Sequence, residues 1–311
     1  MLLRRSLLTP HLKRVVRTQS PRIFRFALSS SFSSSYSSSS RGVVKSPSST
    51  PATTITWDDD DNDDVIGEQK ATAKEFVDKD VLLAEYCQKV YGHTAKNIAV
   101  TFASSGAMVA SGLGLCAAGL VSPDAMVTLF SVSAIGGFIA SLGGSVMLGA
   151  TAPQYDNVYK DVMVNAKTRQ RWANVVHAGF GVLMGPSLLL FGAQVAVPAF
   201  IGAGILTTGP VMASMYLPKG QLLKYGPAMY TGLLGLLGAS IGGIWFPILH
   251  DISVYGGLAL FTAYNAYDTH TMIRDYEDGN QDYIQHSTQY SMNFINIFIR
   301  LMEILTERKD Y

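Results

Sequence analysis

The chain has 311 residues, of which 48% are apolar and only 15% are charged, and its formal net charge is +1. Because a soluble globular protein usually carries about 25% charged residues, this composition disfavours a soluble protein and indicates membrane helices. The 29 glycines also indicate membrane helices, because small residues let such helices pack closely. Cys87 and Cys116 do not have the spacing of a metal site, and we expect two thiols rather than a disulfide.

Residues 1–45 have the composition of a mitochondrial transit peptide. No Asp or Glu occurs before Asp58, whereas Lys and Arg interrupt every apolar run. A secretory signal needs a continuous apolar core of about 7–15 residues, while a mitochondrial presequence is amphipathic, rich in Arg and Ser and poor in acids. The alternative is a disordered basic tail. Because the basic cluster is the part expected to be cleaved, nucleic-acid binding is not expected.

Two further segments precede the apolar part of the chain. Residues 46–70, which contain the run DDDDNDD, are interpreted as a disordered acidic spacer. Residues 71–96 place Phe76, Leu83, Cys87 and Val90 on one helical face. This pattern predicts an interfacial helix that leads into the first membrane span.

Residues 97–311 predict an all-α, polytopic membrane domain. A helix that spans a bilayer needs roughly 20 apolar residues, and six segments satisfy this requirement. A seventh, Tyr290–Leu305, is shorter and more polar. The six predicted spans are Ile98–Val121, Ala125–Ala150, Trp172–Phe191, Val195–Leu217, Tyr225–Trp245 and Ile252–Ile273.

Basic residues occupy alternate loops between the predicted spans, and only Arg308 and Lys309, after the last segment, disagree with this alternation. The loops after the first, third and fifth predicted spans contain no Lys or Arg. The positive-inside rule assigns the other loops to the matrix-like side of an inner mitochondrial membrane, which places the N-terminus in the matrix. The residues on this side are Lys160, Lys167, Arg169, Arg171, Lys219, Lys224 and Arg274.

Small residues repeat at four-residue spacing within three predicted spans. This spacing puts them on one helical face, where backbones approach closely. We therefore expect these faces to form helix contacts. The motifs are Gly136-xxx-Ala140-xxx-Gly144, Gly181-xxx-Gly185 and Gly235-xxx-Ala239-xxx-Gly243.

One acidic side chain lies inside the sixth predicted span. Asp268 follows about sixteen apolar or small residues and, in a continuous helix, lies roughly 9 Å in from Arg274. A carboxylate at membrane depth must face the bundle interior or water, so it is a functional-site candidate. The alternative is that Asp268 caps the helix end near the lipid headgroups.

The last segment carries a polar stripe that would face this carboxylate. Asn293, Asn296, Arg300 and Glu303 fall within an arc of about 80° on a helix. We expect Asp268 to pair with Arg300, to accept a hydrogen bond from Asn293, or to bind a cation. For Asn296 and Arg300, a structural role in joining helices and a role in an ion pathway both remain open.

Three stretches resemble the Bax-inhibitor-1, or transmembrane-Bax-inhibitor-motif, family. They are YGGLALFTAYNAYDTH, which contains Asp268, MNFINIFIRLMEIL near the end, and KVYGHTAKNIAVTF, which leads into the first span. A fourth, YLPKGQLLKYGPAM, is most similar to the mitochondrial member of the family. The resemblance implies a bundle of seven transmembrane helices, with six around a central, polar last helix.

The resemblance also implies a site, from which this chain departs. The family's pH sensor is a pair of aspartates on the sixth and seventh helices; Asp268 matches the first, but Asn293 stands at the second. The family's arginine latch has no counterpart, because Ala125–Ala150 contains no basic residue. Two neighbouring carboxylates share a proton because both cannot ionise cheaply. This coupling is absent here, and a calcium site loses one anionic ligand.

The resemblance implies an inner-membrane calcium transporter or pH-sensitive leak channel, with calcium–proton exchange as one form, and a role in suppressing cell death. Asp268, Asn293, Arg300 and Asn296 are the candidate ion pathway, and Asp268 is the candidate calcium ligand. The alternative is a non-transporting scaffold that organises cristae and retains apoptotic factors. We expect no enzyme and no cofactor. The expected partners are the lipid bilayer, calcium, protons and other inner-membrane proteins.

Overall fold

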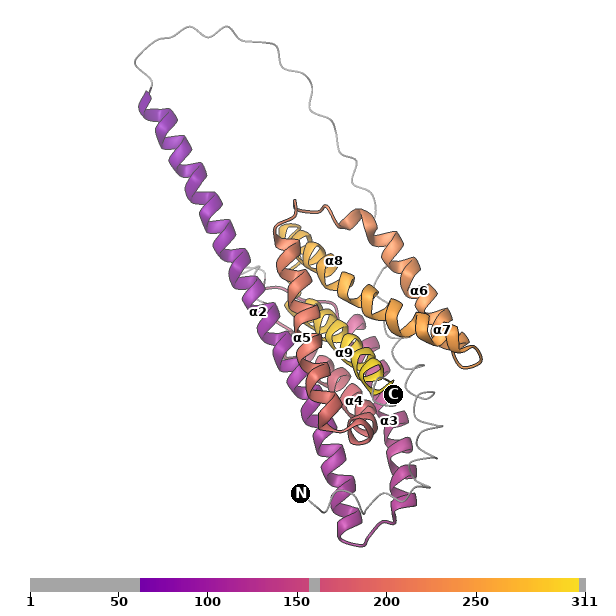
Figure 1. Cartoon of the computed structure of the whole chain (residues 1–311). Coiled ribbons are helices and arrows are strands. Elements are labelled where there is room, and N and C mark those ends of the chain that lie inside the picture. Colours follow the sequence, from indigo (N-terminus) through magenta and orange to yellow (C-terminus); the bar gives the residue numbers. More distant parts are fainter. Residues whose placement is uncertain (1–61, 157–162, 308–311) are drawn as a thin grey trace.

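The computed structural model describes residues 62–156 and 163–307, and for residues 62–80 and Pro123 it describes the backbone alone. The expected transit peptide, and the spacer up to residue 61, lie outside this part. Within it the fold is all-α, as predicted, and seven long helices form a bundle (Figure 1). They are α2 (Asn62–Ala117), α3 (Pro123–Ala150), α4 (Ala166–Phe191), α5 (Ala193–Met215), α6 (Gly226–Gly242), α8 (Gly257–Glu277) and α9 (Tyr283–Glu307).

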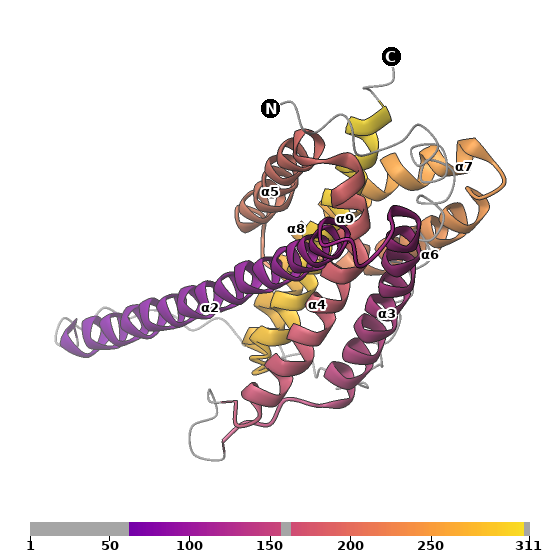
Figure 2. The same cartoon turned by 90° about the horizontal axis from the view of Figure 1, so that it is seen from below.

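The helix α2 is longer than the predicted first span and interfacial helix. Its 56 residues run without a break from Asn62 to Ala117, so residues 62–70 of the expected spacer, the expected interfacial helix and the first predicted span up to Ala117 share one helix. At 1.5 Å per residue the helix is about 84 Å long, and its N-terminal part extends beyond the other helices (Figures 1 and 2). A helix of this length reaches well past the membrane-spanning region.

Short elements connect the later helices. A 3₁₀ turn, η2 (Leu223–Tyr225), precedes α6. The short helix α7 (Pro247–Asp251) continues into a π-helical turn, η3 (Ile252–Gly256), and then directly into α8. The sixth predicted span is therefore part of a longer helical run that begins at Pro247. Single π-turns inside helices occur often at functional sites.

Four helices of the described residues are long and apolar enough to cross a membrane: Val81–Ala117 of α2, Asp124–Ala150 of α3, α4 and α5. The exposed surface of α3 supports this assignment. Val132, Ile135, Ile139 and Val146 lie on one face of α3 and are 51–64% exposed. A continuous apolar face of this kind indicates contact with lipid, so the chain is a multi-pass membrane protein.

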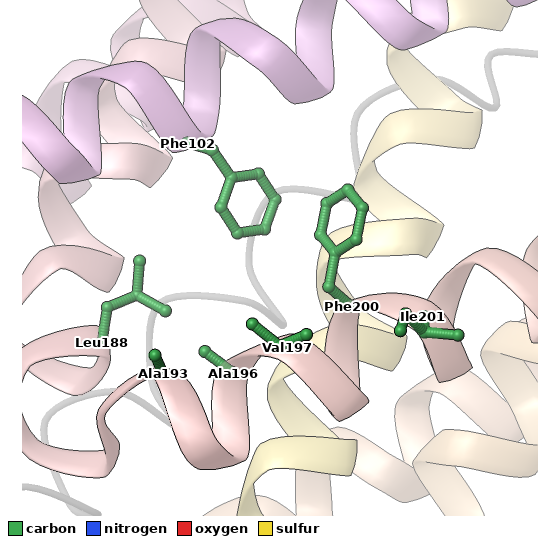
Figure 3. A pocket seen from close by; sticks show the side chains of 7 residues that line it. All are labelled: Phe102, Leu188, Ala193, Ala196, Val197, Phe200 and Ile201. Carbon is green, nitrogen blue, oxygen red and sulfur yellow. The ribbon is translucent and has the colours of Figure 1, made fainter.

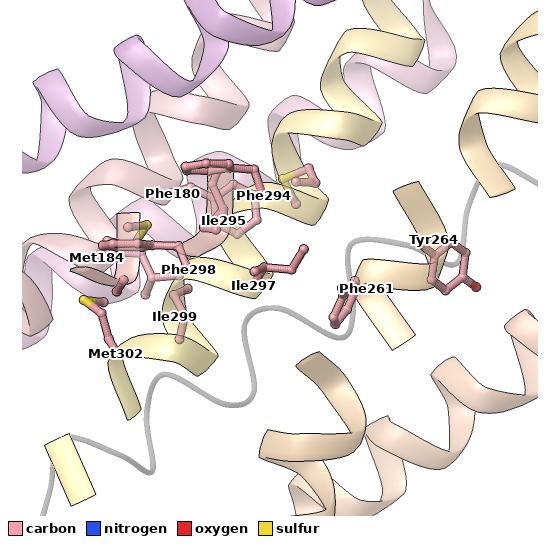
Figure 4. Packing of buried hydrophobic residues seen from close by; sticks show 14 of the residues in the cluster. Phe180, Met184, Phe261, Tyr264, Phe294, Ile295, Ile297, Phe298, Ile299 and Met302 are labelled. Atoms are coloured by element: carbon pink, nitrogen blue, oxygen red, sulfur yellow. The ribbon is translucent and has the colours of Figure 1, made fainter. Parts of the chain in front are cut away.

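The helix α9 lies at the centre of the bundle, where it contacts α2, α4, α5 and α8. All ten residues from Tyr290 to Ile299 are buried. On its apolar side, Phe294 and Phe298 lie with Phe180 of α4 in the main hydrophobic cluster (Figure 4). The predicted central position of the last helix is therefore confirmed.

Glycines allow α4 to approach two neighbouring helices. A methyl group at Gly179 would lie 2.6 Å from the carbonyl oxygen of Gly137, so α3 and α4 touch backbone to backbone. A methyl group at Gly181 would overlap Thr101 and Ser104 of α2. The second predicted small-residue motif is therefore a contact face.

The other two motifs are only partly confirmed. Gly144 of the first motif packs against Val176, but a side chain at Gly136 or at Gly235 would meet no neighbouring atom within 4 Å. The contact face of α3 runs instead through Gly137 and Gly144. The four-residue pattern identified α3 as a packing helix and placed Gly144 correctly, but the close contact lies at Gly137 rather than at Gly136.

The basic loops meet at one end of the bundle, as predicted from the presence of Lys and Arg in alternate loops. The Tyr155 hydroxyl, after α3, donates a hydrogen bond to the side-chain oxygen of Asn280, after α8, at 3.2 Å. Lys219, after α5, forms an exposed ion pair with Glu277 at 2.8 Å. These contacts join the loops that follow α3, α5 and α8, which places all three on the same side of the membrane domain.

Candidate functional site

Asp268 and Asn293 meet in the interior of the bundle. The Asn293 side-chain nitrogen donates a hydrogen bond to a carboxylate oxygen of Asp268 at 2.7 Å. Asp268 is 6% exposed and Asn293 is fully buried. The helix α8 continues from Asp268 for nine residues to Glu277. Asp268 therefore does not cap the end of its helix, and the second of the three expected contacts is the one observed.

Arg300 does not form the expected pair with Asp268. It lies seven residues beyond Asn293, about 10 Å along α9, and packs instead against the start of α8. Its guanidinium lies over the Phe261 ring, 5.4 Å from the centroid. A methyl group at Gly257 would overlap the same guanidinium. The absence of a side chain at Gly257 thus makes room for Arg300.

The Asp268 carboxyl has no basic partner in the part of the chain whose side chains are described: no Lys, Arg or His lies within ion-pair distance of it. Its neighbour, the Asn293 amide, is neutral. A buried carboxylate without a compensating cation is costly. The site is therefore suited to gaining positive charge, as a proton or a cation.

One more polar pair and two buried asparagines lie on the same helices, α8 and α9. The Tyr290 hydroxyl donates a hydrogen bond to the Thr269 hydroxyl at 2.9 Å. Asn265 and Asn296 are both buried and lie one helical turn from Asp268 and Asn293 respectively. Asn296 belongs to the predicted polar stripe of the last segment, whereas Asn265 was not predicted as a site residue. The signal was present, because Asn265 and Asp268 are three residues apart and share a helical face.

A separate polar cluster surrounds His177 on the other side of α9. One ring nitrogen of His177 lies 3.3 Å from the Thr101 hydroxyl of α2, and the other lies 3.0 Å from the Ser291 hydroxyl of α9. The ring is fully buried. His177 thus joins three helices by hydrogen bonds and acts as a polar packing residue.

A buried ion pair at the basic end was not anticipated. The Arg169 guanidinium, in the first turn of α4, contacts the carboxylate of Asp282, which precedes α9. Arg169 also donates hydrogen bonds to the carbonyl oxygens of Leu148 and Thr151, where α3 ends. Burial raises the pKa of the Asp282 carboxyl, and the adjacent Arg169 guanidinium opposes that shift. This pair ties together α3, α4 and α9.

The apolar pocket between α2, α4 and α5 does not belong to the candidate site. Its volume is about 380 Å³, and every side chain that lines it is apolar (Figure 3). An ion would find no ligand there. The lining residues are Phe102, Leu188, Ala193, Ala196, Val197, Phe200 and Ile201.

No resident metal centre is evident in the described residues, since no group of three or more His, Cys, Asp or Glu is placed to hold a metal ion. The carboxyl at Asp268 stands among amides rather than other acids. The described helices and this site together define a class: a polytopic membrane bundle in which a buried carboxyl without a basic partner faces the central helix.

Comparison with known proteins identifies the family. Residues 83–310 match the family model described as "Inhibitor of apoptosis-promoting Bax1", so the chain belongs to the Bax inhibitor 1 family. This match confirms the resemblance found in the sequence. No solved structure gives a significant match to the chain.

Individual relatives are similar over parts of the chain. Human (Homo sapiens) "Bax inhibitor 1" is 31% identical over 137 residues, which are 41% of this chain and 58% of the relative. The Bos taurus protein of the same name is 26% identical over 189 residues, 58% of this chain and 75% of the relative. Rattus norvegicus "Growth hormone-inducible transmembrane protein" is 28% identical over 145 residues, 42% of each chain.

Proposed function

We propose that this chain is a cation transporter or pH-sensitive leak channel of the mitochondrial inner membrane, with calcium as the favoured ion, and that it suppresses cell death. Asp268 is the group that exchanges a proton for a cation, and Asn293 is its hydrogen-bonding partner. Calcium–proton exchange is one form of this activity. The description of the matched family model as an inhibitor of apoptosis-promoting Bax1 supports the link to cell death.

The observation that carries this proposal is the environment of Asp268. Ionisable residues inside membrane bundles are rare and mark ion pathways or proton relays. Asp268 is buried against the central helix and is hydrogen-bonded only to a neutral amide among the described side chains. A structural ion pair would have placed Arg300 beside Asp268. Arg300 instead lies two turns of α9 beyond Asn293, the residue that contacts Asp268.

The N-terminal composition supports the mitochondrial location. Residues 1–45 combine Arg and Ser with a complete absence of acidic residues, as mitochondrial presequences do. The chain is also similar to the rat growth hormone-inducible transmembrane protein. The shared side of the basic loops supports an orientation with those loops in the matrix.

A scaffold without transport activity is the second candidate, and the shape of α2 favours it. The N-terminal part of α2 projects beyond the other helices (Figure 2). A projecting helix offers a surface for another inner-membrane protein, as a role in organising cristae or retaining apoptotic factors would require. Asn293 also favours this candidate, because a site with one carboxylate binds calcium more weakly than a site with two.

Calcium flux through the purified protein distinguishes the two candidates. The full-length chain, reconstituted into liposomes that contain a fluorescent calcium indicator, should carry calcium at a rate that changes with pH. Protein-free liposomes provide the baseline. Folded protein that carries no calcium at any pH between 5 and 8 would leave the scaffold as the better account.

A further inference from the structure

The two helices that hold Asp268 and Asn293 have a well-defined antiparallel register. Asp268 contacts Asn293 through a hydrogen bond, and the Phe261 ring contacts Arg300. From the first contact to the second, α8 recedes by seven residues and α9 advances by seven. Seven residues are two turns, or about 10 Å, on each helix.

Asn265 and Asn296 fall between these two contacts. Each lies three residues from the first contact and four residues from the second, on its own helix. Because residues three or four apart share a helical face, both asparagines lie on the faces where α8 and α9 meet. Asn265 is 0% exposed and Asn296 is 1% exposed.

Hydrogen bonds to the helix backbone fix the orientation of both amides. The Asn265 nitrogen donates to the carbonyl oxygen of Phe261 at 3.0 Å, and the Asn296 nitrogen donates to that of Met292 at 2.9 Å. A carbonyl oxygen only accepts hydrogen bonds, so the atom beside it must be the amide nitrogen. Each amide oxygen is therefore turned away from its own backbone.

Three amide oxygens are left without partners in this contact. Across the described residues, the side-chain oxygens of Asn265, Asn293 and Asn296 are buried and accept no hydrogen bond. Buried polar atoms in proteins are nearly always satisfied, and an exception calls for an explanation such as an ion or water that the site binds. Carboxylate and asparagine oxygens are the ligands that calcium prefers.

We infer that Asn265 and Asn296 form, with Asn293 and Asp268, an oxygen-lined binding site in which amide oxygens replace part of the hydration shell of a divalent cation. The inference rests on the proposed function, and it specifies how the site holds its ion. One carboxylate supplies the charge and three neutral oxygens supply the coordination, with water completing the shell. Such a site binds calcium weakly enough to release it, as transport requires.

Equilibrium binding of radioactive calcium to the purified full-length protein, followed by flux in liposomes, tests this site. Asn265→Leu and Asn296→Leu remove an oxygen at nearly constant volume, and each should raise the half-saturating calcium concentration by about tenfold. Asn97→Leu is the matched control. Asn97 is fully buried, but its amide bonds Ser287 and Gln170 in another part of the bundle, so calcium affinity should not change.

A gain in affinity separates loss of a ligand from loss of fold. Asn296→Asp adds a second carboxylate to the site and should lower the half-saturating calcium concentration by about tenfold, which a misfolded protein cannot do. Calcium binding that depends on Asp268 but is unchanged in Asn265→Leu, Asn296→Leu and Asn296→Asp would overturn the amide site and leave the proposed function standing. Folded native protein that neither binds nor carries calcium would overturn both.

Discussion

Asn293 donates a hydrogen bond to the carboxylate of Asp268 at 2.7 Å, and this contact joins the central helix α9 to α8 inside the bundle. An amide thus occupies the position at which the family resemblance implies a second acid. The native pair carries one titratable group, so it lacks the coupling that two carboxyls would have.

Asn293→Asp should make calcium flux depend more steeply on pH. Two carboxyls 2.7 Å apart cannot both ionise cheaply, so they share a proton. The measurement is calcium flux in liposomes from pH 5 to pH 8 for the native chain and the variant. Identical pH profiles would show that the two side chains do not act as a coupled pair.

Arg169→Met should destabilise the protein by about 3–5 kcal/mol, because it leaves the Asp282 carboxylate buried without its partner. Chemical unfolding in detergent micelles measures this loss. The exposed pair between Lys219 and Glu277 is the control, and Lys219→Met should cost at most about 1 kcal/mol. Equal losses in the two variants would contradict a special role for the buried pair.

The destabilisation caused by Arg169→Met should also depend on pH. Burial raises the pKa of Asp282 above its unfolded value, and the variant removes the guanidinium that opposes this shift. A carboxyl with a raised folded pKa stabilises the fold at low pH and loses that contribution as pH rises through the folded pKa. The loss should therefore be smaller at pH 5 than at pH 8, and the reverse trend would contradict the assignment.

Gly257→Ala should destabilise the protein by about 1–3 kcal/mol, because the added methyl group overlaps the Arg300 guanidinium. Adding Arg300→Ala should recover part of the loss by removing the overlap. Gly204→Ala in α5 is the matched control, because its methyl group would meet no atom within 4 Å. Thermal unfolding of the four proteins measures these effects, and a Gly257→Ala variant as stable as Gly204→Ala would refute the contact.

His177→Leu should weaken the fold but not the transport. The ring bonds Thr101 and Ser291, so its removal should cost about 1–3 kcal/mol. Without the ring, both hydroxyls can donate to carbonyl oxygens of their own helices, at Asn97 and Ser287, which limits the loss. Calcium flux per folded molecule should match the native rate. A flux abolished in folded His177→Leu would place this histidine in the ion pathway.

The sequence predicted the long helices because membrane spans are set by a single quantity, the length of an apolar run. The length of an apolar run does not predict that α2 continues through the charged residues before the span. The charged residues 62–96 change the polarity of the chain but do not end a helix, so the change in composition near Asn97 suggested a boundary that the backbone does not have.

Some of the buried polar contacts could be predicted from the sequence, and others could not. Asp268 and Asn293 were predicted because a carboxylate inside an apolar run and a polar stripe on the next helix must find each other. Arg169 and Asp282 are separated by 113 residues, and no local pattern relates them. Their contact depends on how the helix ends come together, which becomes visible only in the fold.

Calcium flux through Asp268→Asn tests the central claim most directly. The variant keeps the size of the side chain and removes its charge, and the exposed Asp278→Asn, ten residues further along the chain, is the matched control. We predict that Asp268→Asn abolishes pH-dependent calcium flux in liposomes while Asp278→Asn retains it. Native flux and native pH dependence in a folded Asp268→Asn protein would contradict the account.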